Sequence, residues 1–315
     1  MTVAPAPIAV FVYNRYEHFV KTIKALSCNY LAPISELYVV SDCWYDISHK
    51  EDVLKVRKYA EGIIGFKSVH LIFRKTNMGA FESFYDAQKT ILNNHEKLIV
   101  MEDDIVTSPN YLDFINQGLE FYKDYTEVYS VTGYCHPGIV PDNYPFDYWV
   151  SPFNFSWGYG FWKDRDRELD LRYNPYNVIR SDSKLWAQFK EYGGFVLESL
   201  LGDHLGLSQM ADARICAHML IKRMVAIAPK ISKVKNIGCD GSGLHARKLT
   251  KFDGPLDPGI NRRFHFDRDL SFNDDVVRRY LRFMSGNIVK RSFRNCGVLA
   301  LRDYLRWFYK RLTAC

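Results

Sequence analysis

The stretch Leu98-Ile99-Val100-Met101-Glu102-Asp103-Asp104 joins a short apolar run to three consecutive acids. The apolar run predicts a buried strand, and open α/β sheets bind ligands at the carboxyl ends of their strands. Mg²⁺ and Mn²⁺ take carboxylate oxygens as ligands. Because successive side chains of an extended backbone point to opposite sides, we expect only one of Asp103 and Asp104 on a metal. A solvated acidic turn would explain the spacing equally well.

The residues around this stretch alternate between strand and helix patterns, which predicts βαβ units and a doubly wound sheet. The expected strands are 8–13, 37–41, 69–73, 98–101, 128–132 and 225–228. The expected helices include 80–92, 183–191, 210–223 and one that runs to residue 122, with Ser108 as its N-cap and Pro109 in its first turn. Four prolines between residues 133 and 162 predict irregular structure over much of that segment.

Composition narrows the class of protein. The chain has 315 residues, 47% of them hydrophobic, and no apolar run near the ~20 residues that a membrane span needs. Its seven cysteines contain no C-x-x-C pair and its start has no signal-peptide pattern, so a reducing, cytoplasmic location is expected. Residues 278–315 hold ten Lys or Arg and one acid, so this tail carries +9, whereas the preceding residues sum to −3.

Several motifs that would name other enzyme classes do not occur. A P-loop ATPase is excluded because the chain has no Gly-Lys pair. No G-x-G-x-x-G, H-E-x-x-H or G-x-S-x-G occurs, so nothing favours a Rossmann dehydrogenase, a zincin or an α/β-hydrolase. A sugar nucleotidylyltransferase would need a Gly-rich basic loop after the first strand, where this chain has Asn14-Arg15-Tyr16-Glu17.

The chain resembles nucleotide-sugar glycosyltransferases of the GT-A fold, family 2-like bacterial enzymes above all, and is also similar to the N-acetylglucosaminyltransferase I family. The matching stretches of the first half are PIAVFVYNR (7–15), Ser41-Asp42-Cys43, Asn77-x-Gly79, Glu102-Asp103-Asp104 and the aromatic-glycine segment SWGYGFW (156–162). In the family this last segment forms a wall of the sugar site, although aromatic residues at this density could equally belong to the core. The resemblance implies an α/β fold with a mostly parallel sheet flanked by helices. The charge and apolar spacing of the tail predict a basic, helical C-terminal extension after it.

The resemblance also implies roles for residues of the first half. Asp104 corresponds to the ligand of a Mn²⁺ or Mg²⁺ cofactor, and Asp103 lies near the ribose of the donor. Asp42 corresponds to the acid that contacts the uracil base. Asn77 belongs to the loop before the helix that precedes the metal-binding strand, and it is expected to contact the donor. Arg15 is expected to bind a phosphate.

In the second half the family pattern is an Asp on a helix, then a Pro-x-hydrophobic-Ser segment, an Asn-Ile-Gly and a His. Here these are Asp212, residues 229–232, residues 236–238 and His245. The pattern implies that His245 completes the metal shell or donates to the diphosphate. Ser242, in the same loop, is expected to contact the donor.

Asp212 is the candidate general base of an inverting transfer. The family flanks this Asp with aromatics, whereas here its neighbours are small and apolar, except for Arg214. A purely structural explanation would pair Asp212 with Arg214 or Lys222 on the helix surface. Asp203 and His204 are alternatives for the base.

The expected organisation is a nucleotide-sugar-binding half (1–125), an acceptor-binding half (126–250), and a linker with basic amphipathic helices (251–315). The expected partners are a UDP-sugar donor and a glycan or lipid-linked oligosaccharide acceptor, with no nucleic acid. Apolar and basic stripes in residues 297–315 favour either docking on an anionic membrane, on the inner face of the plasma membrane, or packing against the protein itself. A non-catalytic binding or scaffold protein with this fold is the alternative function.

Overall fold

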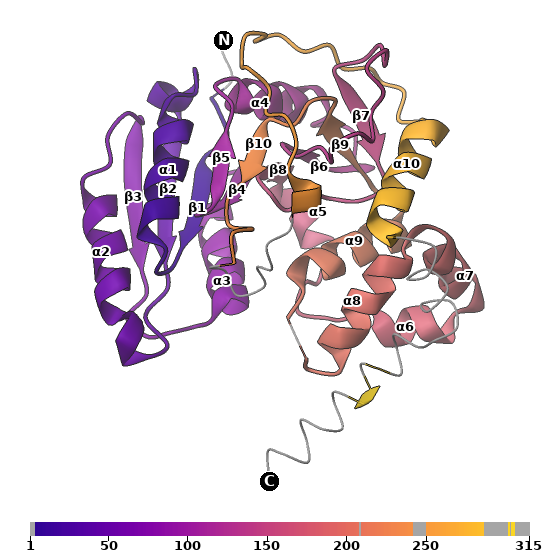
Figure 1. The fold of residues 1–315 in the computed structure, drawn as a ribbon, viewed down its shortest axis with the longest axis horizontal. Helices are drawn as coiled ribbons and strands as arrows, with labels where there is room; N and C mark the ends of the chain where they lie inside the picture. Colours follow the sequence, from indigo (N-terminus) through magenta and orange to yellow (C-terminus); the bar gives the residue numbers. More distant parts are fainter. Residues whose placement is uncertain (1–3, 208, 242–249, 287–301, 303, 306–315) are drawn as a thin grey trace.

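The structure is a computed structural model, and it describes residues 4–207, 209–241, 250–286, 302 and 304–305. Its centre is an eight-stranded mixed sheet with the order β3-β2-β1-β4-β8-β6-β9-β7, covered by helices on both faces (Figure 1). The strands of this sheet are β1 (Ile8–Val12), β2 (Glu36–Ser41), β3 (Ser68–Phe73), β4 (Lys97–Glu102), β6 (Val128–Thr132), β7 (Tyr148–Ser151), β8 (Tyr159–Trp162) and β9 (Val225–Pro229). The expected α/β class with a mostly parallel sheet is therefore confirmed.

The helices are α1 (Tyr16–Ser27), α2 (Lys50–Glu61), α3 (Ala80–Leu92), α4 (Tyr111–Phe121), α5 (Lys163–Arg167), α6 (Tyr176–Ser181), α7 (Ser183–Tyr192), α8 (Gly194–His204), α9 (Ala211–Lys222) and α10 (Asp274–Ser285). A second, two-stranded sheet joins β5 (Ile105–Thr107) to β10 (Val234–Asn236). Short 3₁₀ turns lie at Ala32–Ile34, Ile47–His49 and Thr250–Phe252.

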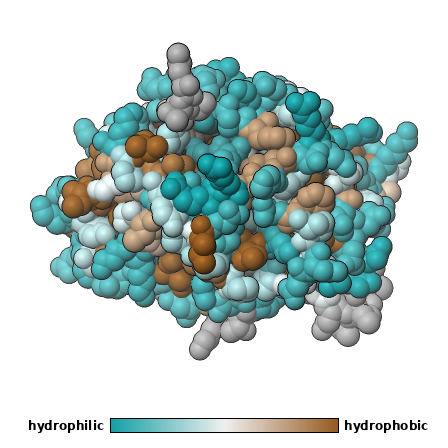
Figure 2. All heavy atoms as spheres, turned by 90° about the horizontal axis from the view of Figure 1, so that it is seen from above, coloured by the Kyte–Doolittle hydropathy of each residue, from teal (hydrophilic) through white to brown (hydrophobic). Residues whose placement is uncertain are grey.

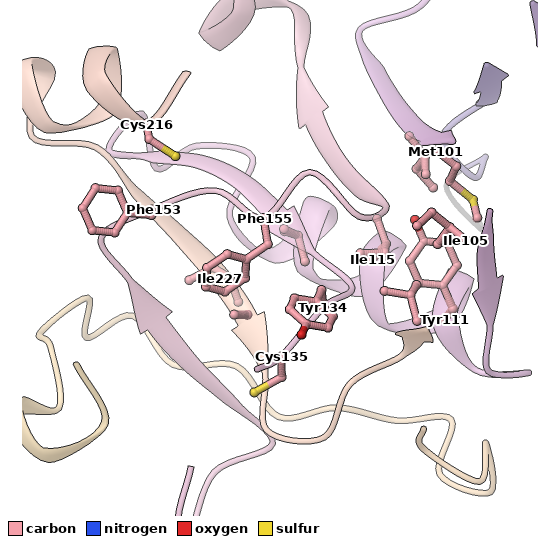
Figure 3. Packing of buried hydrophobic residues seen from close by; sticks show 14 of the residues in the cluster. Met101, Ile105, Tyr111, Ile115, Tyr134, Cys135, Phe153, Phe155, Cys216 and Ile227 are labelled. Carbon is pink, nitrogen blue, oxygen red and sulfur yellow. The ribbon is translucent and has the colours of Figure 1, made fainter. Parts of the chain in front are cut away.

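Alternation along the central strands divides the core between the two faces of the sheet. Ile99 and Met101 of β4 belong to the larger apolar cluster, which also takes in α1, α2 and α4. Leu98 and Val100 belong to a smaller cluster under α3. Figure 3 shows Met101 beside Ile105, Tyr111 and Ile115 in the larger cluster. An apolar strand buried on both faces is the pattern that β4 showed in the sequence.

The segment between residues 133 and 162 is irregular over most of its length, as predicted, but it contains two short strands that the sequence did not predict. β7 pairs with β9, and β8 lies antiparallel between β4 and β6. Both strands are four residues long and fully buried. Such short strands are stabilised by their neighbours in the sheet rather than by their own sequence pattern.

The predicted start of α4 was wrong. The helix begins at Tyr111 with Asn110 as its N-cap residue. The Ser108 hydroxyl does not cap the helix and donates to the Asn110 side-chain oxygen at 2.7 Å. The Asn110 amide in turn donates to the carbonyl of Asn261 at 2.7 Å. The residue at the N-cap position, Asn110, is therefore bound to the distant segment around Asn261.

The linker that the sequence predicted around residues 253–275 is packed against the domain, and residues 261–267 of it lie along α4. The Gln117 amide donates to the carbonyl of Arg262 at 2.8 Å, and the Tyr122 hydroxyl to that of Asp267 at 2.7 Å. Phe264 meets Phe114 edge to face. This segment leads into α10, whose Tyr280 is buried against the β7 end of the sheet.

The predicted amphipathic tail helix lies almost entirely outside the described residues. Within them, no helix combines the length and the apolarity that crossing a bilayer requires. On the face shown in Figure 2, hydrophobic side chains form small separate groups among hydrophilic ones.

Candidate functional site

The acids at the end of β4 lie next to Arg15, which follows the neighbouring strand. β1 and β4 are parallel, with Phe11 level with Glu102, so both strands end at the same edge of the sheet. The Arg15 guanidinium contacts Asp103 and lies 2.9 Å from an oxygen of Asp104. α1 also holds the acidic turn, because the Thr22 hydroxyl donates to the backbone carbonyl of Asp103 at 2.7 Å.

The electrostatics of this turn reflect burial and crowding of like charges. Asp103 and Asp104 are almost wholly buried, and burial raises the pKa of Asp103 to about 6 although Arg15 opposes the shift. The pKa of Glu102 is also raised, by the surrounding protein first and then by the charges of Asp104, Asp103 and Asp212, although its side chain still reaches water. Burial alone would lower the pKa of Arg15, but the two aspartates outweigh it and raise that pKa.

The Asn236-Ile237-Gly238 segment returns to the acidic turn, because β10 pairs antiparallel with β5. The amide of Ile237 donates to the backbone carbonyl of Asp104 at 2.9 Å. A Cβ at Gly238 would lie 2.0 Å from a carboxylate oxygen of Asp104 and 2.8 Å from an Arg15 nitrogen. Only glycine therefore fits between this loop and the ion pair. The sequence showed the motif but not this close approach.

Asp42 and Asn77 come together in a clamp at the end of β2. The Asp42 carboxylate accepts from the amides of Cys43 and Gly79, each at 2.8 Å, and of Met78 at 3.0 Å. The Asn77 amide donates to the carbonyl of Cys43 at 2.6 Å. Asp42 thus fixes the loop that leads into α3. The sequence predicted that both residues contact the nucleotide-sugar donor. It did not predict the hydrogen bond from the Asn77 amide to the Asp42 carboxylate at 3.2 Å.

Asp212 lies in the first turn of α9, is exposed, and accepts from the amide of Ala213 at 3.1 Å. Its charge raises the pKa of Glu102, so α9 brings it toward the end of β4. The sequence suggested Arg214 or Lys222 as a structural partner of Asp212. In the structure Lys222 pairs with Glu168 at 2.8 Å, and Arg214 pairs with Asp203.

Arg214 grips Asp203, with contacts of 2.6 and 2.9 Å. The Asn174 amide also donates to Asp203 at 2.9 Å, and Asp203 is buried. A carboxylate so fully engaged is a structural anchor, which makes it a poor candidate base. His204, the other alternative, stacks on the ring of Tyr176.

Most aromatic side chains of segment 156–162 belong to the hydrophobic core rather than to the surface of a sugar-binding site. Tyr159, Phe161 and Trp162 are buried within β8. Trp157 is only partly buried and contacts Tyr134 edge to face. Of these four aromatic residues, Trp157 is the one that is accessible enough to contact a sugar.

Ser242 and His245 lie outside the described residues. Among the described ones, no group of three or more His, Cys, Asp or Glu side chains is arranged to hold a metal ion. One oxygen of the Asp104 carboxylate is nevertheless buried without a hydrogen-bond partner in the described part of the chain. That orphaned oxygen fits a Mn²⁺ or Mg²⁺ ion that takes its remaining ligands from substrate phosphates and water.

Comparisons with known proteins give distant likenesses in part of the fold. The chain is similar to the mannosyltransferase PcManGT from Pyrobaculum calidifontis, solved in complex with GDP-Man and Mn²⁺, with a TM-score of 0.37 and 17% identity over 52% of this chain and 46% of that one. It is similar to TarS of S. aureus with a TM-score of 0.31 and 15% identity over 48% of this chain and 25% of that one. The matches therefore span less than half of either relative, and at these TM-scores they leave activity and substrates open. No protein-family model and no curated protein matches the sequence.

Proposed function

We propose that this protein is a metal-dependent glycosyltransferase. It transfers a sugar from a nucleoside diphosphate donor, with UDP the expected nucleotide, to a hydroxyl of a glycan or lipid-linked glycan. The observation that carries the proposal is the end of β4, where one buried oxygen of Asp104 has no hydrogen-bond partner among the described residues and lies beside the Arg15 guanidinium and the loop at Gly238. Such a site offers a place for a cation and, next to it, a donor for phosphate oxygens.

The charges of the site fit an anionic donor only if a further cation is present. Asp103, Asp104 and Asp212 each raise the pKa of Glu102. Among the described residues, Arg15 is the cation in contact with Asp103 and Asp104. A bound Mn²⁺ or Mg²⁺ would offset this negative charge and the charge that develops on the diphosphate when the glycosidic bond breaks. Arg15 would bind a phosphate oxygen as a bidentate donor, and Asp104 would hold the ion. Asp103 is expected near the ribose, Asp42 and Asn77 near the base, and Ser242 and His245 on the donor and the ion.

Asp212 is the proposed general base, which makes the transfer a single inverting displacement. Its position in the first turn of α9 places it at the positive end of a helix dipole, where the ionised form that accepts a proton is stabilised. Its carboxylate would take the proton of the acceptor hydroxyl as that oxygen attacks the anomeric carbon. Arg214 does not compete for it as its main partner, because Arg214 binds Asp203 in a two-point contact.

Thermal shift with a panel of UDP- and GDP-sugars, each with Mn²⁺, tests donor binding. A ligand at 100 times its Kd stabilises the folded state by about 2.7 kcal/mol. We expect one donor to raise the melting temperature, chelation to abolish the effect, and Asp104→Ala to lose it. Asp124→Asn, which removes an exposed charge on the turn after α4, is the matched control.

Release of nucleoside diphosphate from the selected donor tests catalysis. Asp212→Asn should keep the thermal shift and lose turnover. If Asp212→Asn turns over like the wild type, the base lies elsewhere and the assignment of Asp212 is wrong.

The alternative is a non-catalytic binding or scaffold protein, and one observation favours it. Arg15 already forms ion pairs with both Asp103 and Asp104, so the acidic motif can serve a structural role without a metal. In that case no donor in the panel would be turned over, and Asp104→Ala would lower the melting temperature without any metal-dependent effect. Metal-dependent release of nucleoside diphosphate eliminates this alternative.

A further inference from the structure

Arg15 is fixed at its backbone and adjustable at its side chain. Its carbonyl accepts from the amide of Phe19 at 3.0 Å, so the residue is anchored at the start of α1. Its side chain is 20% exposed, whereas those of Asp103 and Asp104 are 5% and 7% exposed. The guanidinium can therefore change partners at the surface, while the two carboxylates cannot leave the interior without disturbing the turn.

The two oxygens of Asp104 have different surroundings. One lies 2.9 Å from Arg15 and directly under Gly238. The other is buried and has no hydrogen-bond partner among the described residues. A buried carboxylate oxygen without a donor is unfavourable in the protein alone, so this side of Asp104 is prepared for a ligand that brings positive charge.

A cation at that oxygen would lie next to the positive guanidinium. The two positive charges, the ion and the guanidinium, would repel each other. The repulsion is strong because Asp103 and Asp104, the carboxylates of this site, are almost wholly buried. The ion and Arg15 therefore compete for the negative charge of Asp104. An anionic diphosphate relieves the competition, because it offers Arg15 another partner and gives the ion further oxygen ligands.

We propose that Arg15 is an internal counter-cation that holds Asp103 and Asp104 in the donor-free protein and moves to the donor's diphosphate when a divalent cation takes Asp104. This inference rests on the proposed function of the same site. It makes the metal bind weakly alone and tightly with nucleotide, and by reciprocity each ligand raises the affinity for the other by the same factor.

The test is direct binding of Mn²⁺ and of UDP to the full chain by calorimetry and by the electron paramagnetic resonance of free Mn²⁺. Arg15→Gln removes the charge and keeps a hydrogen-bonding side chain. It should bind Mn²⁺ without nucleotide about tenfold more tightly than the wild type, within the usual range of coupling energies. It should bind UDP in the presence of Mn²⁺ at least about tenfold more weakly. A residue that only binds phosphate would change the second affinity and leave the first unchanged.

Arg15→Lys is the matched variant, because it keeps the positive charge and loses the planar guanidinium that can donate two parallel hydrogen bonds. It should leave Mn²⁺ binding without nucleotide close to that of the wild type, and it reports on the charge even if Arg15→Gln does not fold. Equal or weaker Mn²⁺ binding in folded Arg15→Gln, or Mn²⁺ binding to Arg15→Lys as tight as predicted for Arg15→Gln, would overturn the inference while leaving the proposed function standing. A wild-type protein that binds neither Mn²⁺ nor UDP, singly or together, would overturn both.

Discussion

Replacing Gly238 by alanine tests the central contact of the site. The new methyl carbon would lie 2.0 Å from an Asp104 oxygen, against an ordinary contact of 3.4 Å or more, so the carboxylate must retreat by roughly 1.4 Å. Asp104 has a short, buried side chain and an ion pair of 2.9 Å with Arg15, which would have to lengthen. Overpacking of this kind costs about 1–3 kcal/mol, and weakening a hydrogen bond between charged groups costs up to about 1.5–3 kcal/mol more.

We therefore expect Gly238→Ala to lose roughly 2–4 kcal/mol of unfolding free energy, since the two costs overlap, and roughly 4–8 °C in melting temperature. Circular dichroism during heating measures this loss, and Mn²⁺ titration measures the accompanying change at Asp104. Gly238 is not among the glycines with positive φ, so the effect is steric rather than a loss of backbone freedom.

Gly62→Ala is the matched control. Gly62 also has a negative φ, and the nearest atom to its added Cβ is a carbonyl oxygen at an ordinary 3.7 Å. We expect the control to stay within about 0.5 kcal/mol of the wild type. If Gly238→Ala melts like Gly62→Ala, the loop after β10 does not rest on the acidic turn, and the geometry assigned to the site is wrong.

Burial lowers the pKa of His136 to about 3, so stability should fall by up to about 5 kcal/mol as the pH drops from 6.5 toward 3, where the unfolded chain binds the proton and the folded one resists it; His136→Phe should flatten this fall in urea titrations, and an unchanged slope would refute the assignment. Asp42→Ala should speed hydrogen exchange at the Met78 and Gly79 amides and cost roughly 2–4 kcal/mol, because three amides lose a charged acceptor; wild-type exchange rates would contradict the clamp. Asp257→Ala should cost roughly 3–5 kcal/mol in chemical denaturation, because it leaves the buried ammonium of Lys233 unpaired; a loss below 1 kcal/mol would mean that water reaches that ammonium.

Local patterns carried much of the fold. The strands around residues 8–12, 98–101 and 225–228 were predictable because buried parallel strands are short apolar runs. The helix Ala80–Leu92 was predicted with its bounds, since a glycine precedes it and its apolar spacing is regular. The acids at the end of β4 were likewise predictable as a candidate site, because strand ends follow directly from strand positions.

Other features depend on residues that are far apart in the chain. β8 enters the sheet between β4 and β6, and its aromatic residues were as consistent with a sugar-binding wall as with core. Asp203 looked like a candidate base until Arg214 and Asn174 were seen to engage it. Burial and pairing of this kind are long-range properties, and residue type and spacing do not report them.

The sequence alone determined the class of the sheet, the positions of its first strands along the chain and the chemical type of the groups at its edge, because these follow from hydrophobic period and residue identity. The tertiary structure decided which of those groups touch. It joined Arg15 to two aspartates 88 and 89 residues away, and it placed Gly238 against them while one oxygen of Asp104 found no partner in the part of the chain that the structure describes. The physical reason is that contact and desolvation are set by how strands from different parts of the chain end at one edge, which no local pattern encodes.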